Sequence, residues 1–251
     1  MNDNNKLSMD REKIDIERVR TLYNQMDDIW PASDKWYTYT HQQMMKYIDG
    51  FKKKYAISNS SKVVNIGSAG NEYNIPGEHY HVDIAEERIK HCSRFYVGSA
   101  EKLPFTDNFF DIGLCVGSVI NYCDPLLVIS EISRVLKPNA VSVLDFEQSR
   151  SYQFIGSSFN CNARIITSFN SGVDDRIWVF SERLIRSYCK IYGLKIMNVR
   201  YFHLLTPLIY LICKDENKAA NFTLADKFLR WIPFLRKISC NVILTVQKSA
   251  I

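Results

Sequence analysis

The feature that most constrains this chain is a short apolar run that ends in small residues, at 62–70. Its apolar positions are Val63, Val64 and Ile66, a β-branched composition typical of a buried strand. The run passes into Gly67-Ser68-Ala69-Gly70, where small side chains let backbone N–H groups approach a ligand closely. The run therefore predicts a central strand of an open α/β sheet, with a binding site at its carboxyl end.

An acidic residue ends the next predicted strand, at 79–84. A carboxylate at the position of Asp83 can accept hydrogen bonds from both hydroxyls of a ribose. Asp is also a favoured N-cap, and a helical stretch follows at 85–90. Asp83 can therefore serve in either role, or in both.

Three further motifs follow in a characteristic order. They are Gly98-Ser99-Ala100-Glu101-Lys102-Leu103-Pro104-Phe105, then Phe110-Asp111, then Arg134-Val135-Leu136-Lys137-Pro138. Together they resemble the class I S-adenosylmethionine-dependent methyltransferases, in particular the group similar to ubiquinone and menaquinone C-methyltransferases. The resemblance covers about residues 60–147, with looser agreement toward the C-terminus.

The resemblance implies an α/β fold with a doubly wound, mostly parallel seven-stranded sheet, the Rossmann-like methyltransferase fold. We expect one domain over 1–251, with an N-terminal helical lid (1–60), a cofactor-binding half (61–147), a β-hairpin inserted after strand five (148–180) and a C-terminal half (181–251). Strands are expected at 62–66, 79–84, 94–97, 111–116, 141–146, 194–203 and 241–247, the last of them antiparallel to its neighbour. Residues 204–211 are expected to continue a strand or to form an apolar loop.

Helical periodicity appears at 14–23, 40–55, 125–136 and 181–192, whereas 30–41 is aromatic-rich and turn-prone. The segment 225–238 mixes aromatic and basic residues. We expect it to form a helix that faces the core and keeps its charges in solvent. Weak contact with a membrane surface is the alternative.

The resemblance assigns the cofactor, S-adenosyl-L-methionine, to thirteen positions. Asn65, Gly67, Ser68, Ala69 and Gly70 form the turn under its amino-acid part; Asp83, with Ile84 beside it, holds the ribose; Ser99, Ala100 and Glu101 edge the adenine; Cys115, Val116 and Gly117 line the floor. Three positions depart from the family pattern, because Asn65 and Ser99 replace acids and Ala69 replaces glycine. An alanine at 69 costs little if its φ is negative.

The implied activity is methyl transfer to a small-molecule acceptor by in-line displacement. Positioning supplies most of the acceleration, so no catalytic base is assigned. Candidate acceptor contacts are Tyr37, Tyr39 and His41 in the lid, Asn121 and Tyr122 after strand four, and Glu147 after strand five. The lid aromatics can equally fill core, and Glu147 can equally form a cap or an ion pair on the surface. Relatives often carry histidine at the position of Asn121, so this chain lacks one candidate base.

The amino-acid composition limits the classes of binding partner and the cellular compartment that we expect. The net charge of +5 is mild and its basic residues are dispersed, which argues against nucleic acid as the main partner. Seven scattered cysteines without a Cys-x-x-Cys pair predict neither a zinc site nor a disulfide framework, and they fit a reducing cytoplasm. His79 and His81 lack an evident third ligand, so we expect no metal. The polar N-terminus lacks the apolar core of a signal peptide, and no apolar run approaches the roughly 20 residues of a membrane span.

Two other functions compete with methyl transfer. The changes at Asn65, Ser99 and Asn121 suggest a methyltransferase-like protein that binds a ligand or partner without catalysis. A nicotinamide-dependent oxidoreductase also uses a strand, a turn and a ribose carboxylate. It ranks last, because Ala69 and Glu72 occupy the second and third glycine positions of the Gly-x-Gly-x-x-Gly fingerprint.

Overall fold

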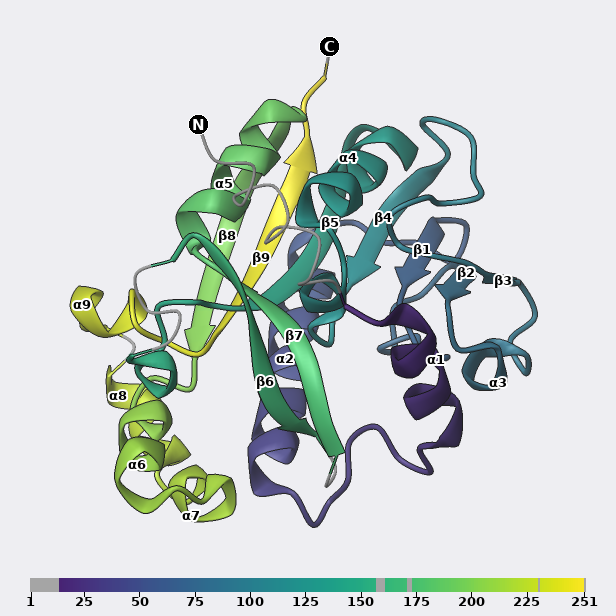
Figure 1. The fold of residues 1–251 in the computed structure, drawn as a ribbon. Coiled ribbons are helices and arrows are strands. Elements are labelled where there is room, and N and C mark those ends of the chain that lie inside the picture. The colour runs from purple at the N-terminus through teal and green to yellow at the C-terminus, as the bar shows by residue number, and fades with distance from the viewer. Residues whose placement is uncertain (1–13, 157–160, 171–172, 230, 251) are drawn as a thin grey trace, which may run out of the picture.

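A single sheet organises the computed structural model, which describes residues 14–156, 161–170, 173–229 and 231–250. Its strands are β1 (Lys62–Ile66), β2 (Glu78–Asp83), β3 (Phe95–Val97), β4 (Phe110–Cys115), β5 (Leu136–Glu147), β8 (Leu194–Phe202) and β9 (Asn241–Lys248). Their spatial order is β3-β2-β1-β4-β5-β9-β8 (Figure 1). The first five strands pair in parallel, and β9 is antiparallel to both β5 and β8. The predicted doubly wound, mostly parallel sheet is confirmed.

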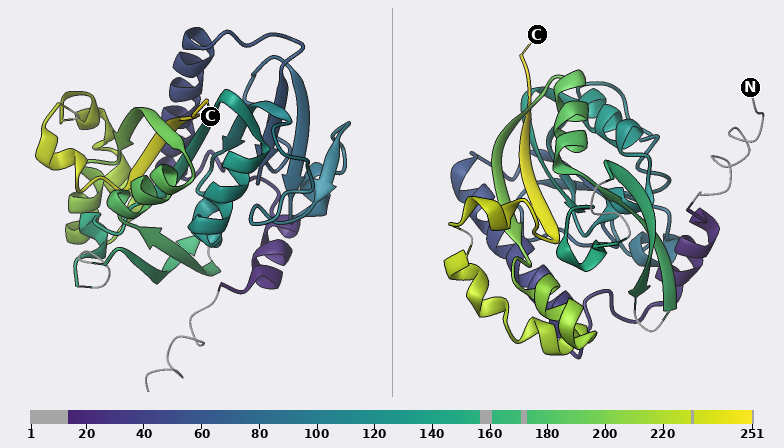
Figure 2. Two further views of the ribbon diagram at one scale, coloured as in Figure 1. Left: turned by 90° about the horizontal axis from the view of Figure 1, so that it is seen from above. Right: turned by 60° about the vertical axis from the view of Figure 1, so that its left-hand side comes forward.

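Helices cover both faces of this sheet (Figure 2). The helices are α1 (Ile16–Gln25), α2 (Lys35–Lys54), α3 (Glu86–Ile89), α4 (Pro125–Val135), α5 (Glu182–Ile191), α6 (Thr206–Cys213), α7 (Glu216–Ala220), α8 (Asp226–Leu229) and α9 (Pro233–Arg236). On β1, Val64 and Ile66 join the core shared with α4 and α5, whereas Val63 joins the core shared with α2. Alternate residues of one strand thus fill two cores, which explains the nearly continuous apolar run.

Helix α2 begins earlier than the sequence predicts. Its N-cap is Asp34, whose Oδ1 accepts a hydrogen bond from the backbone N–H of Tyr37 at 3.0 Å. The expectation that the turn-prone segment extends to residue 41 is therefore wrong. The cap outweighs the low helix propensity of the aromatic and threonine residues in the first two turns.

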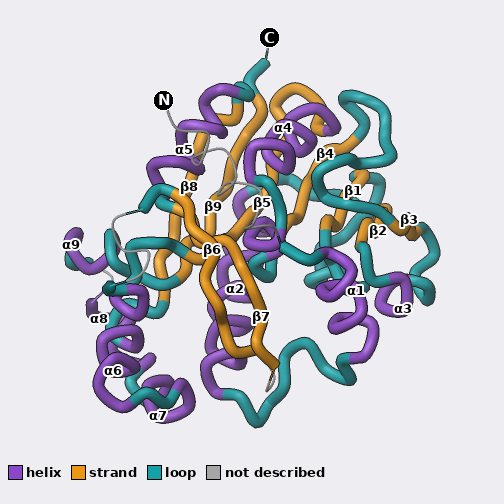
Figure 3. The backbone as a smooth tube through the Cα atoms, viewed as in Figure 1, coloured by secondary structure: helices purple, strands orange, loops and turns teal. Residues whose placement is uncertain are grey.

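A separate two-stranded hairpin follows β5, as expected. It consists of β6 (Ala163–Asn170) and β7 (Val173–Phe180), which pair with each other and leave the plane of the main sheet (Figure 3). The side-chain amide of Asn121 donates to the carbonyl of Trp178 on β7 at 2.5 Å. This bond ties the hairpin to the loop that follows β4.

The C-terminal half differs from the prediction in two places. Of the residues expected to form a strand or loop at 204–211, those from Thr206 onward belong to helix α6, where Pro207 lies in the first turn, a position that tolerates its missing N–H. The segment 225–238 does not form one core-facing helix, because α8 and α9 are separate short helices and Phe228, Trp231 and Phe234 are 79%, 71% and 60% exposed. Among the described residues, no helix has the length and apolar character that a membrane crossing requires.

Arg134, at the end of α4, fixes the loop that leads from β3 to β4. Its guanidinium donates to the carbonyls of Leu103 at 3.0 Å and Phe105 at 2.6 Å. It also pairs with the carboxylates of Glu131 at 2.7 Å and Asp107 at 2.9 Å. One side chain therefore satisfies two loop carbonyls that no strand partner reaches, which explains the arginine in the third motif.

We expect Arg134→Met to lower the free energy of unfolding by about 2–3 kcal/mol, because it leaves the two loop carbonyls without their donor and removes the charged partner of Glu131. Urea denaturation followed by circular dichroism measures the change. The matched control is Arg20→Met, which removes only an exposed pair with Glu17 and is expected to cost less than about 0.5 kcal/mol. Equal losses in the two variants would contradict the assignment.

Candidate functional site

The turn after β1 requires glycine at its first position. Gly67 has a φ of +62°, and a Cβ there would lie 2.5 Å from both γ-carbons of Val119. Its N–H donates to the carbonyl of Val82 at 2.7 Å, which holds the turn against β2. Ala69 has a φ of +45°, so the condition under which alanine costs little is not met. This left-handed conformation costs about 1 kcal/mol or more for a residue with a Cβ.

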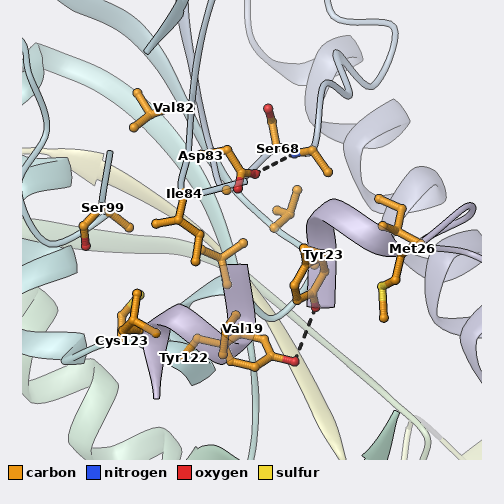
Figure 4. A pocket seen from close by; sticks show the side chains of 18 of the residues that line it. Val19, Tyr23, Met26, Ser68, Val82, Asp83, Ile84, Ser99, Tyr122 and Cys123 are labelled. Atoms are coloured by element: carbon orange, nitrogen blue, oxygen red, sulfur yellow. Dashed lines mark hydrogen bonds between the residues drawn. The ribbon is translucent and has the colours of Figure 1, made fainter. Parts of the chain in front are cut away.

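Asp83 joins the end of β2 to this turn. Its Oδ2 accepts the N–H of Ala69 at 2.9 Å, and its Oδ1 accepts the N–H of Ala85 at 2.9 Å (Figure 4). Burial raises the pKa of this carboxyl, while the backbone donors act in the opposite direction. The carboxylate thus orders both the turn and the approach to α3, and each oxygen retains a lone pair for a ligand.

A cavity of about 940 Å³, its open mouth included, lies at the carboxyl ends of β1, β2 and β4. The predicted cofactor residues that line it are Gly67, Ser68, Ala69, Asp83, Ile84, Ser99, Ala100, Val116 and Gly117. Nine of the thirteen predicted positions therefore face one space.

Asn65 lies outside this lining. Its side chain is buried on the α2 side of the sheet, with Nδ2 2.8 Å from Nδ1 of His79. Nε2 of His79 is 2.7 Å from the carbonyl of Ile75, which can only accept, so Nε2 carries the proton and Nδ1 accepts from Asn65. The side chain of Asn65 thus supports β2 from beneath the turn.

The other three predicted positions also lie behind the lining. Gly70 donates its N–H to Oγ of Ser68 at 3.1 Å, within the turn. Glu101 accepts the N–H of Asp124 at 2.6 Å and thereby fixes the start of α4. Cys115 is fully buried in the core, and burial raises its pKa well above the ordinary value.

Helix α1 and the segment that follows it form one wall of the cavity. Val19, Tyr23, Met26 and Trp30 line it, and the sequence assigned none of them. The Tyr23 hydroxyl donates to the Tyr122 hydroxyl at 3.3 Å, and the two rings meet edge to face (Figure 4). The apolar periodicity at 14–23 indicated a buried helical face, but no local pattern showed what that face covers.

A second cavity, of about 610 Å³ with its open mouth included, adjoins the first. The two share Tyr23, Trp30, Tyr37, Gly117 and Tyr122 as lining residues. The second is further lined by Trp36, Thr40, Ser118, Glu147, Gln153, Glu216 and Asn241. Of the predicted acceptor contacts, Tyr37, Tyr122 and Glu147 are therefore brought together here.

The remaining predicted acceptor contacts point elsewhere. The Tyr39 hydroxyl donates to Asp226 at 3.0 Å, and the His41 ring stacks on Trp30 at 4.9 Å behind the shared wall. Asn121 is fully buried, where its Oδ1 accepts the N–H of Glu147 at 3.1 Å. Asn121 thus joins β5 to the hairpin.

Carboxylates give the second cavity its electrostatic character. Burial, followed by the nearby charges of Asp34 and Asp215, raises the pKa of Glu216 to about 7. Burial also raises the pKa of Tyr37 well above 10, and Glu147 adds to this effect. Tyr37 therefore presents a neutral hydroxyl to both cavities.

Asp145, on β5, supports the turn after β4. Its Oδ1 accepts the N–H groups of Gly117 at 2.8 Å and Ser118 at 3.0 Å. Both turn residues have positive φ, +94° and +60°. Burial raises the pKa of Asp145 to about 6, although the backbone donors favour the ionised form.

A group with metal-ligand chemistry lies behind the turn. Glu72, His79 and His81 each offer a ligand atom, and these atoms lie within 4.8 Å of one another. Spacing along the chain did not reveal Glu72 as a third member. Both ring nitrogens of His79 are already hydrogen-bonded, and Nδ1 of His81 lies 2.9 Å from Oγ of Ser68. Of the three residues, only Nε2 of His81 and the carboxylate of Glu72 therefore remain available as ligands for a metal ion.

Comparison with known proteins agrees with this geometry. Residues 64–144 match the family model described as a methyltransferase domain. This part of the chain has the methyltransferase signature. It contains the turn, Asp83 and the third motif, and S-adenosylmethionine is the cofactor that the match supports. The match covers about a third of the chain, and over that part the chain is similar to a methyltransferase domain.

Individual relatives are more distant. An uncharacterized methyltransferase of Schizosaccharomyces pombe is 42% identical over 55 residues, which are 22% of this chain and 19% of that protein. One similar structure is that of the Burkholderia thailandensis 1,6-didemethyltoxoflavin N1-methyltransferase, solved with 1,6-didemethyltoxoflavin and S-adenosylhomocysteine. It superposes with a TM-score of 0.55 at 11% sequence identity, and the match covers 93% of this chain and 87% of that chain. A chain of the Haloferax volcanii complex that holds the Trm112 methyltransferase activator has a TM-score of 0.60 and 14% identity, covering 88% and 95%. At these identities the solved structures show a shared fold.

We expect Asp145→Asn to change how stability depends on pH. Because the native carboxyl binds its proton more tightly than an unfolded aspartate of ordinary pKa 3.8, ionisation opposes folding as pH rises from 4 through 6. The asparagine keeps an oxygen for both N–H donors and cannot ionise. Relative to wild type, its free energy of unfolding is expected to rise by about 2–3 kcal/mol between pH 4 and pH 8.

Urea titrations at several pH values measure this difference. The control is Asp49→Asn, an exposed carboxylate on α2, for which the difference from wild type is expected to vary little with pH. If the free energy of unfolding varied with pH in the same way for the wild-type protein and for Asp145→Asn, ionisation of Asp145 would not oppose folding and the prediction would be wrong.

Proposed function

We propose that the chain transfers the methyl group of S-adenosylmethionine to a small-molecule acceptor, by in-line displacement driven mainly by positioning. The observation that carries this proposal is the pair of adjoining cavities with one shared wall. The first contains the turn and Asp83, and the second is closed by aromatic rings and carboxylates. Such a pair of cavities can hold the methyl donor and the methyl acceptor side by side, with the reacting atoms at the shared wall.

The residues of the first cavity fit the cofactor. Asp83 has lone pairs left for ribose hydroxyls, and the Ser99 hydroxyl can meet the adenine amine. Apolar side chains of Ile84, Val116 and Val119 lie between these polar ends. When bound, the cofactor supplies a methyl group on a positively charged sulfur. We propose that Asn65, Gly70, Glu101 and Cys115 support this lining from behind.

The chain's own contribution is to orient the acceptor and exclude water. Tyr37 and Tyr122 belong to both cavities, so each can fix the acceptor relative to the cofactor. Glu147 lines the second cavity alone and offers a negative charge to the acceptor. No side-chain base is needed for a nucleophile that is already uncharged and reactive, because the leaving sulfur is positive.

Three finer assignments belong to the same proposal. Within the class I enzymes, the motifs at 98–105 and 134–138 favour the group similar to ubiquinone and menaquinone C-methyltransferases. A small-molecule acceptor, rather than nucleic acid, agrees with the small ligand in the Burkholderia structure and with the mild net charge. The seven free cysteines favour a reducing, cytoplasmic setting.

We expect Asp83→Ala to weaken binding of S-adenosylmethionine at least tenfold, or about 1.4 kcal/mol, because it removes a charged hydrogen-bond acceptor and loosens the turn at Ala69. Isothermal titration calorimetry with the cofactor and with S-adenosylhomocysteine measures the change. Asp83→Asn, which keeps an acceptor but loses the charge, is expected to lie between wild type and alanine.

Asp49→Ala, an exposed substitution on α2, is the control and should bind as wild type does. Circular dichroism of each variant at the titration temperature separates lost affinity from unfolding. Unchanged affinity in folded Asp83→Ala, or absence of binding in the wild-type protein at ~1 mM cofactor, would refute the proposed site.

A further inference from the structure

The second cavity collects hydrogen-bond acceptors from three distant parts of the chain. Glu147 ends β5, Glu216 begins α7, and Asn241 begins β9. Asn241 is 3% exposed, and its Oδ1 has no hydrogen-bond partner among the described residues. A buried carbonyl oxygen without a donor is costly, so this oxygen is left to accept a hydrogen bond from a ligand or a water.

The charge of this cavity has one sign. Its lining contains the carboxylates of Glu147 and Glu216, and no lysine or arginine is among the described residues that form it. Both carboxylates raise the pKa of Tyr37, after the larger effect of burial, so both lie near the wall shared with the first cavity. A ligand placed against that wall therefore meets negative charge.

Aromatic rings form much of the remaining enclosure. Tyr23, Trp30, Trp36, Tyr37 and Tyr122 all line it. Ring faces attract cations, by about 0.5–2 kcal/mol according to exposure. The rings and the carboxylates therefore favour the same kind of charge.

We propose that this cavity takes an acceptor whose nucleophile is an uncharged amine nitrogen bearing N–H, and stabilises the positive charge that methylation places on it. This inference rests on the proposed function and adds the class of acceptor. The nitrogen lone pair forms the new N–C bond as the C–S bond breaks, with its electron pair staying on sulfur. The positive charge passes from sulfur to nitrogen, and the N–H proton then leaves to the carboxylate of Glu216.

The alternative nucleophiles fit the cavity poorly. A phenol or carboxylic acid reacts through its anion, and the two carboxylates that line the cavity disfavour a third negative charge there. A charge that develops on nitrogen is instead stabilised by groups that are already in place. The pKa of Glu216, about 7, suits a group that accepts a proton near neutral pH.

The test uses a matched pair of probes and does not require turnover. The cation is 3-hydroxyphenyltrimethylammonium, which mimics a methylated nitrogen, and its uncharged isostere is 3-tert-butylphenol. Ligand-observed NMR titration at pH 8 gives both dissociation constants for the wild-type protein and for Glu216→Gln, Glu147→Gln and the control Glu87→Gln. Glu87 lies on α3, where its exposed side chain pairs with Lys90.

We expect the wild-type protein to bind the cation at least tenfold more tightly than the isostere, and each of the first two variants to reduce this ratio at least threefold. Glu87→Gln should leave the ratio unchanged. Equal binding of the two probes, tighter binding of the isostere, no binding of the cation at ~10 mM, or a ratio unaffected by both substitutions would overturn the inference. Calorimetry with S-adenosylhomocysteine, run separately, reports on the cofactor site, so failure of the proposed function is distinguishable from failure of this inference.

Discussion

The carboxylate of Asp83 is the interaction on which the site depends. It accepts backbone N–H groups from the turn after β1 and from the approach to α3, both at 2.9 Å. Because Ala69 holds a left-handed conformation that its Cβ disfavours, the turn needs such an external partner. Parallel pairing of β1 with β2 places the ends of the two strands side by side. The hydrogen bonds of Asp83 then fix the turn after β1 to the end of β2, and together they form one edge of the cavity.

A second buried carboxyl repeats this arrangement on the neighbouring strands. Asp145, on β5, holds the turn at Gly117 and Ser118, which follows β4. Nearby, Asn121 connects Glu147 to the hairpin through Trp178. The position of Glu147 in the second cavity is therefore set by the same loop that supplies the floor of the first.

Local sequence patterns, together with the family resemblance, were sufficient to predict the sheet and nine of the residues that line the first cavity. A strand, its small-residue turn and the next acidic residue are close in sequence, so their geometry follows from parallel pairing. The directions of Asn65 and Asn121 could not be predicted, because each faces a partner that only the folded sheet provides.

Glu216 and the role of α1 were missed for a similar reason. Helix α7 reaches the site because Asn217 accepts the N–H of Lys35 at the start of α2, at 2.8 Å and across the length of the chain. No periodicity or motif encodes such a contact. Helix α6 (Thr206–Cys213) was missed because its apolar run lacks the amphipathic pattern that distinguishes a helix from a strand.

The wall between the two cavities has a thermodynamic consequence. Both cavities are lined by Tyr23, Trp30, Tyr37, Gly117 and Tyr122, so a molecule that reorients any of these four aromatic side chains in one cavity reshapes the other. The first molecule to bind bears the free-energy cost of ordering these side chains, and the second binds to side chains that are already ordered. By thermodynamic linkage the effect is reciprocal: each ligand changes the binding affinity of the other by the same factor.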